Sequence, residues 1–201
     1  MKSVTTATAT ATAILLASAT PAGAEDRLPA GVHEHDGFFL QLQYLLGYQD
    51  LFDDGLSVGG PGSGFRIAIG GTPVRNFVVF GELYGQAAPA PRVEIHGRPV
   101  AADEAFLTLA GIGPGVGYYF GDTGVFLHGA LSFVSAQLDG PTGSSRASGT
   151  GGRLGLGKEW WVSDQWGLGL AGNCAYTVVS DELSDDFNAL ALSLAFSATY
   201  H

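Results

Sequence analysis

NALALSLAFSATY, residues 188–200, decides the fold because its large and small side chains alternate with a period of two. In an extended strand, successive side chains point to opposite faces. One face of this segment carries large side chains, and the other carries small, partly polar ones. The large set is Leu190, Leu192, Leu194, Phe196, Ala198 and Tyr200. The segment is therefore predicted to be a strand whose two faces meet different surroundings.

The same alternation recurs in seven earlier segments. GFFLQLQYLLGY (37–48) sets Phe38 and Leu40 on the apolar face against Gln41 and Gln43. The six remaining candidates span 64–72, 77–86, 105–120, 125–138, 151–162 and 166–178. Gly-Pro-Gly at 113–115 predicts a bulge or bend within one of them.

The connections between these segments alternate in length. Residues 50–63, 88–104, 139–150 and 179–186 form long connections, whereas 73–76, 121–124 and 163–165 form short ones. Strands of about 9–11 residues can cross a bilayer when tilted, and eight of them can close without an open edge. The pattern predicts an all-β fold, an eight-stranded antiparallel up-and-down transmembrane β-barrel.

Large aromatic residues flank every short connection, as in the girdles where transmembrane barrels meet the membrane interfaces. A second belt is predicted near the long connections. A soluble barrel enclosing a lipid would instead carry charged side chains where this chain has Gly, Ala, Ser and Gln. The first girdle comprises Phe38, Phe77, Tyr118, Phe120, Trp160, Trp161, Trp166 and Tyr200, with Tyr119 and Phe126 beside it, and the second comprises Tyr48, Tyr84, Phe106, Phe133, Tyr176 and Phe187.

The first 24 residues are predicted to be a secretory signal peptide. Lys2 precedes an apolar run at 13–17, and Ala22-Gly23-Ala24 supplies a cleavage site. Residues 25–36 would form a polar periplasmic leader, and 37–201 the barrel. Cleavage removes one positive charge, so the net charge changes from −10 to −11. A chain this acidic is a poor partner for nucleic acid.

The signal peptide, the eight alternating segments, the short turns and the aromatic final strand together resemble a known group. They are similar to the small outer-membrane barrels of Gram-negative bacteria, of the OmpX type and the OmpA membrane domain, over residues 37–201. The resemblance implies short turns and termini in the periplasm and long loops outside. It implies outer-membrane lipids, lipopolysaccharide and the outer-membrane assembly machinery as partners. That machinery usually reads a terminal aromatic, whereas here Tyr200 is followed by His201. We expect a monomer without cofactors.

Five ionisable residues fall on the inward face of the predicted barrel. Buried charges need partners, so we interpret them as an internal network that fills the lumen. Glu82 is expected to pair with Arg66 or Arg153, and a catalytic or gating set is the alternative. The five are Arg66, Glu82, His128, Arg153 and Glu159.

The remaining polar groups give weaker signals. His128 and Ser132 share a face but lie about 13 Å apart along the strand, too far for a nucleophile and its base. The HEHD segment (33–36) has no second ligand cluster, so no metal site is predicted. Cys174 and Lys158 fall on the outward face.

The long connections are acidic, with eleven of the 19 acidic residues of the chain against three arginines. They are interpreted as a solvated cap. Divalent cations favour oxygen ligands, so DELSDD (181–186) is a weak candidate cation loop, although it lacks the glycine-centred spacing of a calcium loop. Its candidate ligands are Asp181, Glu182, Asp185 and Asp186.

Three functions remain open from the sequence. The first is a structural or surface-interaction role through the acidic loops, without catalysis. The second is a narrow channel for ions or small solutes, because the many inward Gly and Ala residues leave space in the lumen. The third is a lipid-modifying enzyme, which would require a serine, a histidine and an acid brought together across strands.

Overall fold

The computed structural model describes His35 and residues 37–100, 104–141, 143–180 and 186–201. The predicted signal peptide and the rest of the leader lie outside the described residues. Among those described, no helix is long and apolar enough to cross a bilayer. The strands are β1 (Gly37–Phe52), β2 (Leu56–Val74), β3 (Phe77–Pro89), β4 (Arg92–Ile95), β5 (Arg98–Val100), β6 (Phe106–Tyr119), β7 (Val125–Gly140), β8 (Gly143–Trp161), β9 (Trp166–Ser180) and β10 (Asp186–Tyr200).

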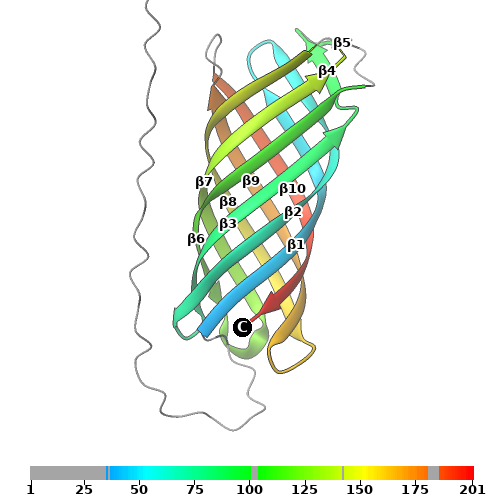
Figure 1. Ribbon diagram of the computed structural model, residues 1–201. Helices are drawn as coiled ribbons and strands as arrows, with labels where there is room; N and C mark the ends of the chain where they lie inside the picture. Colours follow the sequence, from blue (N-terminus) through cyan, green and yellow to red (C-terminus); the bar gives the residue numbers. More distant parts are fainter. Residues whose placement is uncertain (1–34, 36, 101–103, 142, 181–185) are drawn as a thin grey trace, which may run out of the picture. The chain divides into compact units, whose positions relative to one another are not determined.

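Eight strands form a closed antiparallel ring, in the order β1-β2-β3-β6-β7-β8-β9-β10 (Figure 1). The last strand pairs with the first, from Leu40↔Tyr200 to Phe52↔Asn188. Every ring strand therefore has two neighbours, and the predicted eight-stranded up-and-down barrel is confirmed. We call its two ends the short-turn end and the long-loop end.

The alternation of side chains defines the inside and the outside of the ring. In β10, Leu194 is 70% exposed, whereas the next residue, Ala195, is 1% exposed. The large apolar residues thus face outward and the small or polar ones face inward, as predicted. Cys174 and Lys158 also lie on the outer surface.

The strands run further than the side-chain pattern predicted. Leu56–Ser63, assigned to a long connection, continues β2 and pairs with β1, so only residues 53–55 separate the two strands. Residues 143–150 likewise belong to β8. Gly- and Ser-rich stretches hide the alternation, but their backbones still form ladder hydrogen bonds.

Two further strands, β4 and β5, were not predicted. They form a hairpin at the long-loop end, where β4 pairs with the first residues of β2. His96 and Gly97 at its tip both have positive φ, of 49° and 74°, as a two-residue turn between twisted strands requires.

The predicted bulge at Gly-Pro-Gly is wrong. Ile112↔Phe133 and Gly115↔Ala130 keep one register on either side of it, and only the pairs between them are missing. Pro114 has no N–H to donate, so the ladder with β7 is interrupted without an extra residue. The register of β2 and β3 does shift, between Gly71 and Val74 beside their short turn.

Most of the first predicted girdle faces outward at the short-turn end, where Trp166 contacts Tyr200 and Phe38 lies on the other side of that tyrosine. The assignment of Trp161 to this girdle is wrong, because its ring lies 5.1 Å from that of His35, in the mouth of the barrel. Trp160 and Trp161 are adjacent in one strand, so only one of them can face outward.

The same rule corrects four other aromatic assignments. Tyr119 and Phe126 are buried inside the short-turn half, and Tyr84 is buried deeper in the lumen. Phe187 packs against the apolar cluster of the long-loop half. A side chain near a turn is not outward for that reason. Its direction follows from its odd or even position in the strand. The other members of the second belt, Tyr48, Phe106, Phe133 and Tyr176, are exposed.

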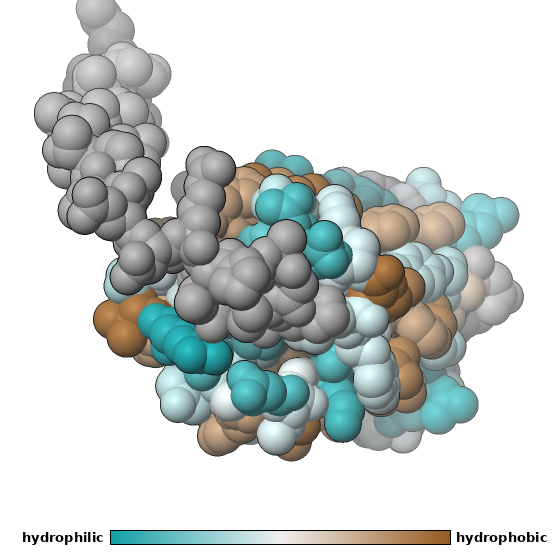
Figure 2. Space-filling model, turned by 90° about the horizontal axis from the view of Figure 1, so that it is seen from below, coloured by the Kyte–Doolittle hydropathy of each residue, from teal (hydrophilic) through white to brown (hydrophobic). Residues whose placement is uncertain are grey.

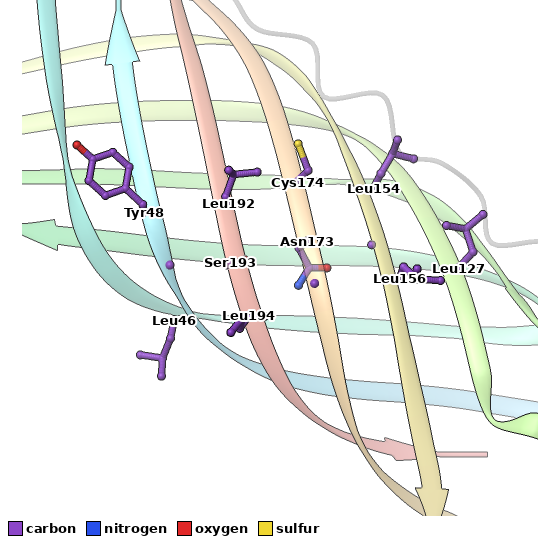
Figure 3. A pocket seen from close by; sticks show the side chains of 13 residues that line it. Leu46, Tyr48, Leu127, Leu154, Leu156, Asn173, Cys174, Leu192, Ser193 and Leu194 are labelled. Atoms are coloured by element: carbon purple, nitrogen blue, oxygen red, sulfur yellow. The ribbon is translucent and has the colours of Figure 1, made fainter.

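An apolar groove of about 660 Å³ crosses the outer surface of β1, β10, β9, β8 and β7 (Figure 3). Leu156 and Leu194 flank Gly172, which has no side chain to fill the space between them. The short-turn end differs from this wall, since hydrophilic and hydrophobic residues are mixed on it (Figure 2). An apolar outer wall suits a ring that is surrounded by lipid.

Candidate functional site

The lumen is the candidate site, and its inward glycines receive side chains from neighbouring strands. A Cβ added at Gly111 would lie 2.6 Å from the ring of Tyr84, and one at Gly115 would lie 2.4 Å from the ring of Phe80. Gly157 lies under Phe126 in the same way. The expectation that inward glycines leave the lumen open is therefore wrong, because adjacent rings occupy the space.

Glu82 on β3 is the centre of a buried charged layer. Its carboxylate accepts a hydrogen bond from Arg66 Nε at 2.6 Å and lies 3.5 Å from Arg153 Nε. Ser132 Oγ donates to the other oxygen at 3.2 Å. The guanidinium of Arg153 also stacks on Tyr84, 3.8 Å from the ring centre. The predicted pairing of Glu82 thus involves both arginines.

Glu159 belongs to a second cluster, nearer the short-turn end. Its carboxylate accepts hydrogen bonds from Gln41 Nε2 at 3.0 Å, from Tyr119 OH at 3.1 Å and from Thr199 Oγ1. His201 Nε2 lies 3.4 Å from the same carboxylate. Glu159 is 5% exposed, so these donors replace the water that a free carboxylate would bind.

Gln41 joins the two clusters, because its amide oxygen accepts a hydrogen bond from Arg66 Nη1 at 2.6 Å. Gln41 on β1 and Glu159 on β8 are not neighbours in the ring, and neither are Ser132 on β7 and Glu82 on β3. These bonds therefore cross the lumen. Four of the five predicted network residues are brought together in this way.

His128, the fifth, stands apart from the network. Its ring stacks on Phe126 and, with the amide of Asn173, lies over the Cα of Gly155. Neither ring nitrogen makes a hydrogen bond of normal geometry within the described chain. His128 lines an internal cavity of about 10 Å³, and a similar one lies beside Tyr84. Each has room for about one water.

The long-loop half of the lumen is mainly apolar, although Gln49, Gln86 and Thr177 are also buried there. Its buried residues come from all around the ring, and Gln49 on β1 reaches across to donate to the carbonyl of Leu107 on β6 at 2.8 Å. Leu56, Val93 and Leu138 pack against the cluster near the β4–β5 hairpin. The cluster comprises Leu51, Val58, Ala88, Leu107, Leu109, Ala136, Ala147, Val179 and Ala189. This apolar cluster closes the lumen between the charged layer and the long-loop end.

Two histidines that the sequence did not assign to the site close the other end. His35 is 4% exposed and His201 is 8% exposed, and their rings contact each other in the short-turn mouth. Their separation of 166 residues left no signal in the sequence. The sequence places His35 in the polar leader, and HEHD predicts no metal site.

The predicted cation loop lies mostly outside the described residues. Asp181, Glu182 and Asp185 are not described, and for Asp186 only the backbone pairing with Ser180 is known. The described acidic residues of the long-loop end include Asp53, whose carboxylate accepts hydrogen bonds from the backbone of Gly55 and Leu56. These hydrogen bonds stabilise the turn between β1 and β2, and they do not indicate a ligand site.

No family model and no curated protein matches this chain. Solved structures do match. Neisserial surface protein A is 16% identical, with a TM-score of 0.57, over 82% of this chain and 96% of that protein. Ail, the attachment invasion locus protein of Yersinia pestis, is 14% identical, with a TM-score of 0.52, over 82% of this chain and 99% of Ail.

The chain has the fold of the small bacterial outer-membrane β-barrels. The match extends along nearly the whole length of both neighbours. At these identities the likeness concerns the fold alone, and one barrel fold serves many functions. The features that can distinguish one function from another are therefore the lumen of this barrel and its two ends.

Proposed function

We propose that this outer-membrane barrel conducts no ions and acts through its long-loop end, as a structural or surface-interaction protein. The observation that carries the proposal is the filled lumen. Charged side chains cross it at the level of Glu82, and an apolar cluster containing Leu107 and Val179 closes it above that level. An eight-stranded barrel is just wide enough for side chains to fill, so both layers leave no continuous path for hydrated ions.

The long-loop end is the surface that remains available to partners. In the orientation of the outer-membrane class it faces the outside of the cell. Its described acidic residues, Asp50, Asp53, Asp54, Glu94, Glu104 and Asp139, exceed its described arginines, Arg92, Arg98 and Arg146. We expect divalent cations to bridge this acidic surface to the phosphates of lipopolysaccharide. The names of both structural neighbours, a surface protein and an attachment protein, are consistent with a surface role.

A narrow channel is the second candidate, and the buried layer of Arg66, Glu82 and Arg153 favours it. Charged side chains inside a barrel are a common means of selecting ions. The apolar cluster argues against conduction, because an ion that loses its water among Leu, Val and Ala side chains gains no polar partner in return.

We propose no catalytic activity. Ser132 does contact a carboxylate, that of Glu82, but His128 makes no hydrogen bond to either group. A serine without a base cannot be deprotonated for attack. The arrangement instead satisfies the second oxygen of Glu82.

The test is the conductance of the refolded mature protein in a planar bilayer, with insertion verified by protease protection. We expect verified insertion without discrete current steps. Discrete steps would overturn the proposal and make Arg66 and Arg153 the first selectivity residues to replace. Failure to insert would overturn the membrane assignment itself and favour a soluble barrel.

A further inference from the structure

His35, two residues before β1, fills the short-turn mouth of the barrel. Its imidazole stacks on the ring of Tyr119 with 3.7 Å between centroids, and the ring of Trp161 lies on another side at 5.1 Å. Its carbonyl accepts a hydrogen bond from the backbone N–H of Asn76, in the β2–β3 turn, at 3.2 Å. His35 is thereby anchored at a defined position beside the β2–β3 turn.

His201 connects His35 to the polar cluster beneath. Its two ring nitrogens lie 3.2 and 3.3 Å from His35 Nδ1, and Nε2 lies 3.4 Å from the carboxylate of Glu159. The backbone N–H of His201 donates to the carbonyl of Gln165, in the β8–β9 turn, at 3.0 Å. His35 is thus the outermost member of a contact chain that leads to a buried carboxylate.

The charges around His35 oppose its protonation. Among the residues that the structure describes, the titratable groups that face it are Tyr119 from β6, Glu159 from β8, His201 after β10 and Arg75 from the β2–β3 turn. Burial, and then the nearby charges of His201 and Arg75, lower the pKa of His35 from 6.5 to about 4, although Glu159 acts in the opposite direction. The closed mouth therefore requires a neutral imidazole.

We propose that His35 is an acid-released latch, which closes the short-turn mouth when its imidazole is neutral and leaves the mouth when the imidazole takes up a proton. Release exposes Tyr119, Trp161 and the Glu159 cluster to water on the periplasmic side. The apolar cluster above the charged layer is untouched, so release opens a vestibule and does not produce a conducting pore. The latch therefore stands independently of the proposed surface role.

The size of the effect follows from proton linkage. A group with pKa about 4 when closed and 6.5 when released makes closure about 20-fold less favourable at pH 5 than at pH 7. The effect approaches its limit of about 300-fold below pH 4. If the equilibrium constant for closing the mouth at neutral pH is smaller than about 300, acid alone shifts the equilibrium to the open state.

The experiment uses Trp161 as a reporter in the full mature chain refolded into vesicles. Trp160→Phe and Trp166→Phe leave Trp161 as the single tryptophan. Between pH 7.5 and 4 we expect its emission to move to longer wavelength, with a midpoint between 4 and 6.5, while the strand signal in circular dichroism stays constant. No shift of the emission, or a parallel loss of the strand signal, would overturn the latch.

His35→Phe is the matched control. Phenylalanine preserves ring contact with Tyr119 and Trp161 but cannot take up a proton, so the acid transition should disappear while the neutral-pH emission persists. A transition that persists in this variant would overturn the role of His35. Imidazole chemical shifts of His35 provide a second measurement: a midpoint below 5.5 is expected, and one near 6.5 would contradict the buried, closed state.

Discussion

The two halves of the lumen are lined by the same eight strands, yet they are filled by different chemistry. The short-turn half holds two carboxylates, two arginines and three histidines. Hydrogen bonds and ion pairs, several of which cross the ring, join these groups apart from His128. The long-loop half is filled mainly by Ala, Val and Leu, with Gln49 bonded across it and with Gln86 and Thr177 also buried. The short-turn half is stabilised by specific hydrogen bonds and ion pairs, and the long-loop half is stabilised mainly by apolar packing. Their responses to substitution should therefore differ in kind.

Replacing Glu82 with leucine should give the largest effect. Arg66 and Arg153 would remain buried without a counter-charge, and breaking a buried ion pair from one side costs about 3–5 kcal/mol. The free energy of unfolding in urea, measured in vesicles, gives this value. The triple variant Arg66→Met, Glu82→Leu, Arg153→Met should recover most of the loss. A single variant as stable as the wild type would show that the charged layer is not specifically paired.

Leu107→Ala tests the apolar half. Leu107 is fully buried, and its truncation should cost about 2–5 kcal/mol through lost burial and the cavity that remains. This loss should not depend on pH between 7.5 and 5, because no titratable group belongs to the cluster. A pH-dependent loss would mean that the two halves are coupled and would weaken the contrast between them.

Gly115→Ala tests the glycine that lies against Phe80. The added methyl would overlap that ring, so we expect a loss of about 1–3 kcal/mol from overpacking. Gly81→Ala is the matched control, because nothing lies within 4 Å of its added Cβ on the outer surface. Equal unfolding free energies for the two variants would contradict the glycine-filling account of the closed lumen.

Acid should weaken the short-turn half alone. The pKa of His35 is lowered in the folded state, so the unfolded chain binds more protons and stability falls as the pH drops from 6.5 towards 4. The slope is about 1.4 kcal/mol per pH unit for one group. The difference between wild type and His35→Phe isolates it in urea titrations at pH 7 and 5. Parallel pH profiles would exclude His35 as the source.

The direction of each side chain, inward or outward, was predictable because successive side chains of an extended backbone point to opposite faces. Arg66, Glu82, Arg153 and Glu159 were all placed inside from their positions in alternating segments, and the structure buries all four. The same rule, applied strictly, places Trp161, Tyr119, Phe126, Tyr84 and Phe187 inside. Those five residues were assigned to the girdles because they lie near a connection between strands.

The sequence alone determined that this chain is a closed ring of eight strands with an apolar outside, because period-two alternation and turn spacing are written in consecutive residues. Only the tertiary structure decided which inward groups meet. Glu82 reaches two arginines, Glu159 joins a separate cluster, and His35 meets His201 across 166 residues. Such contacts depend on the stagger and closure of the whole ring, which bring residues from non-adjacent strands to one level. Side chains that cross the lumen from opposite walls therefore closed it, although the glycine-rich inner faces of the single strands had predicted open space.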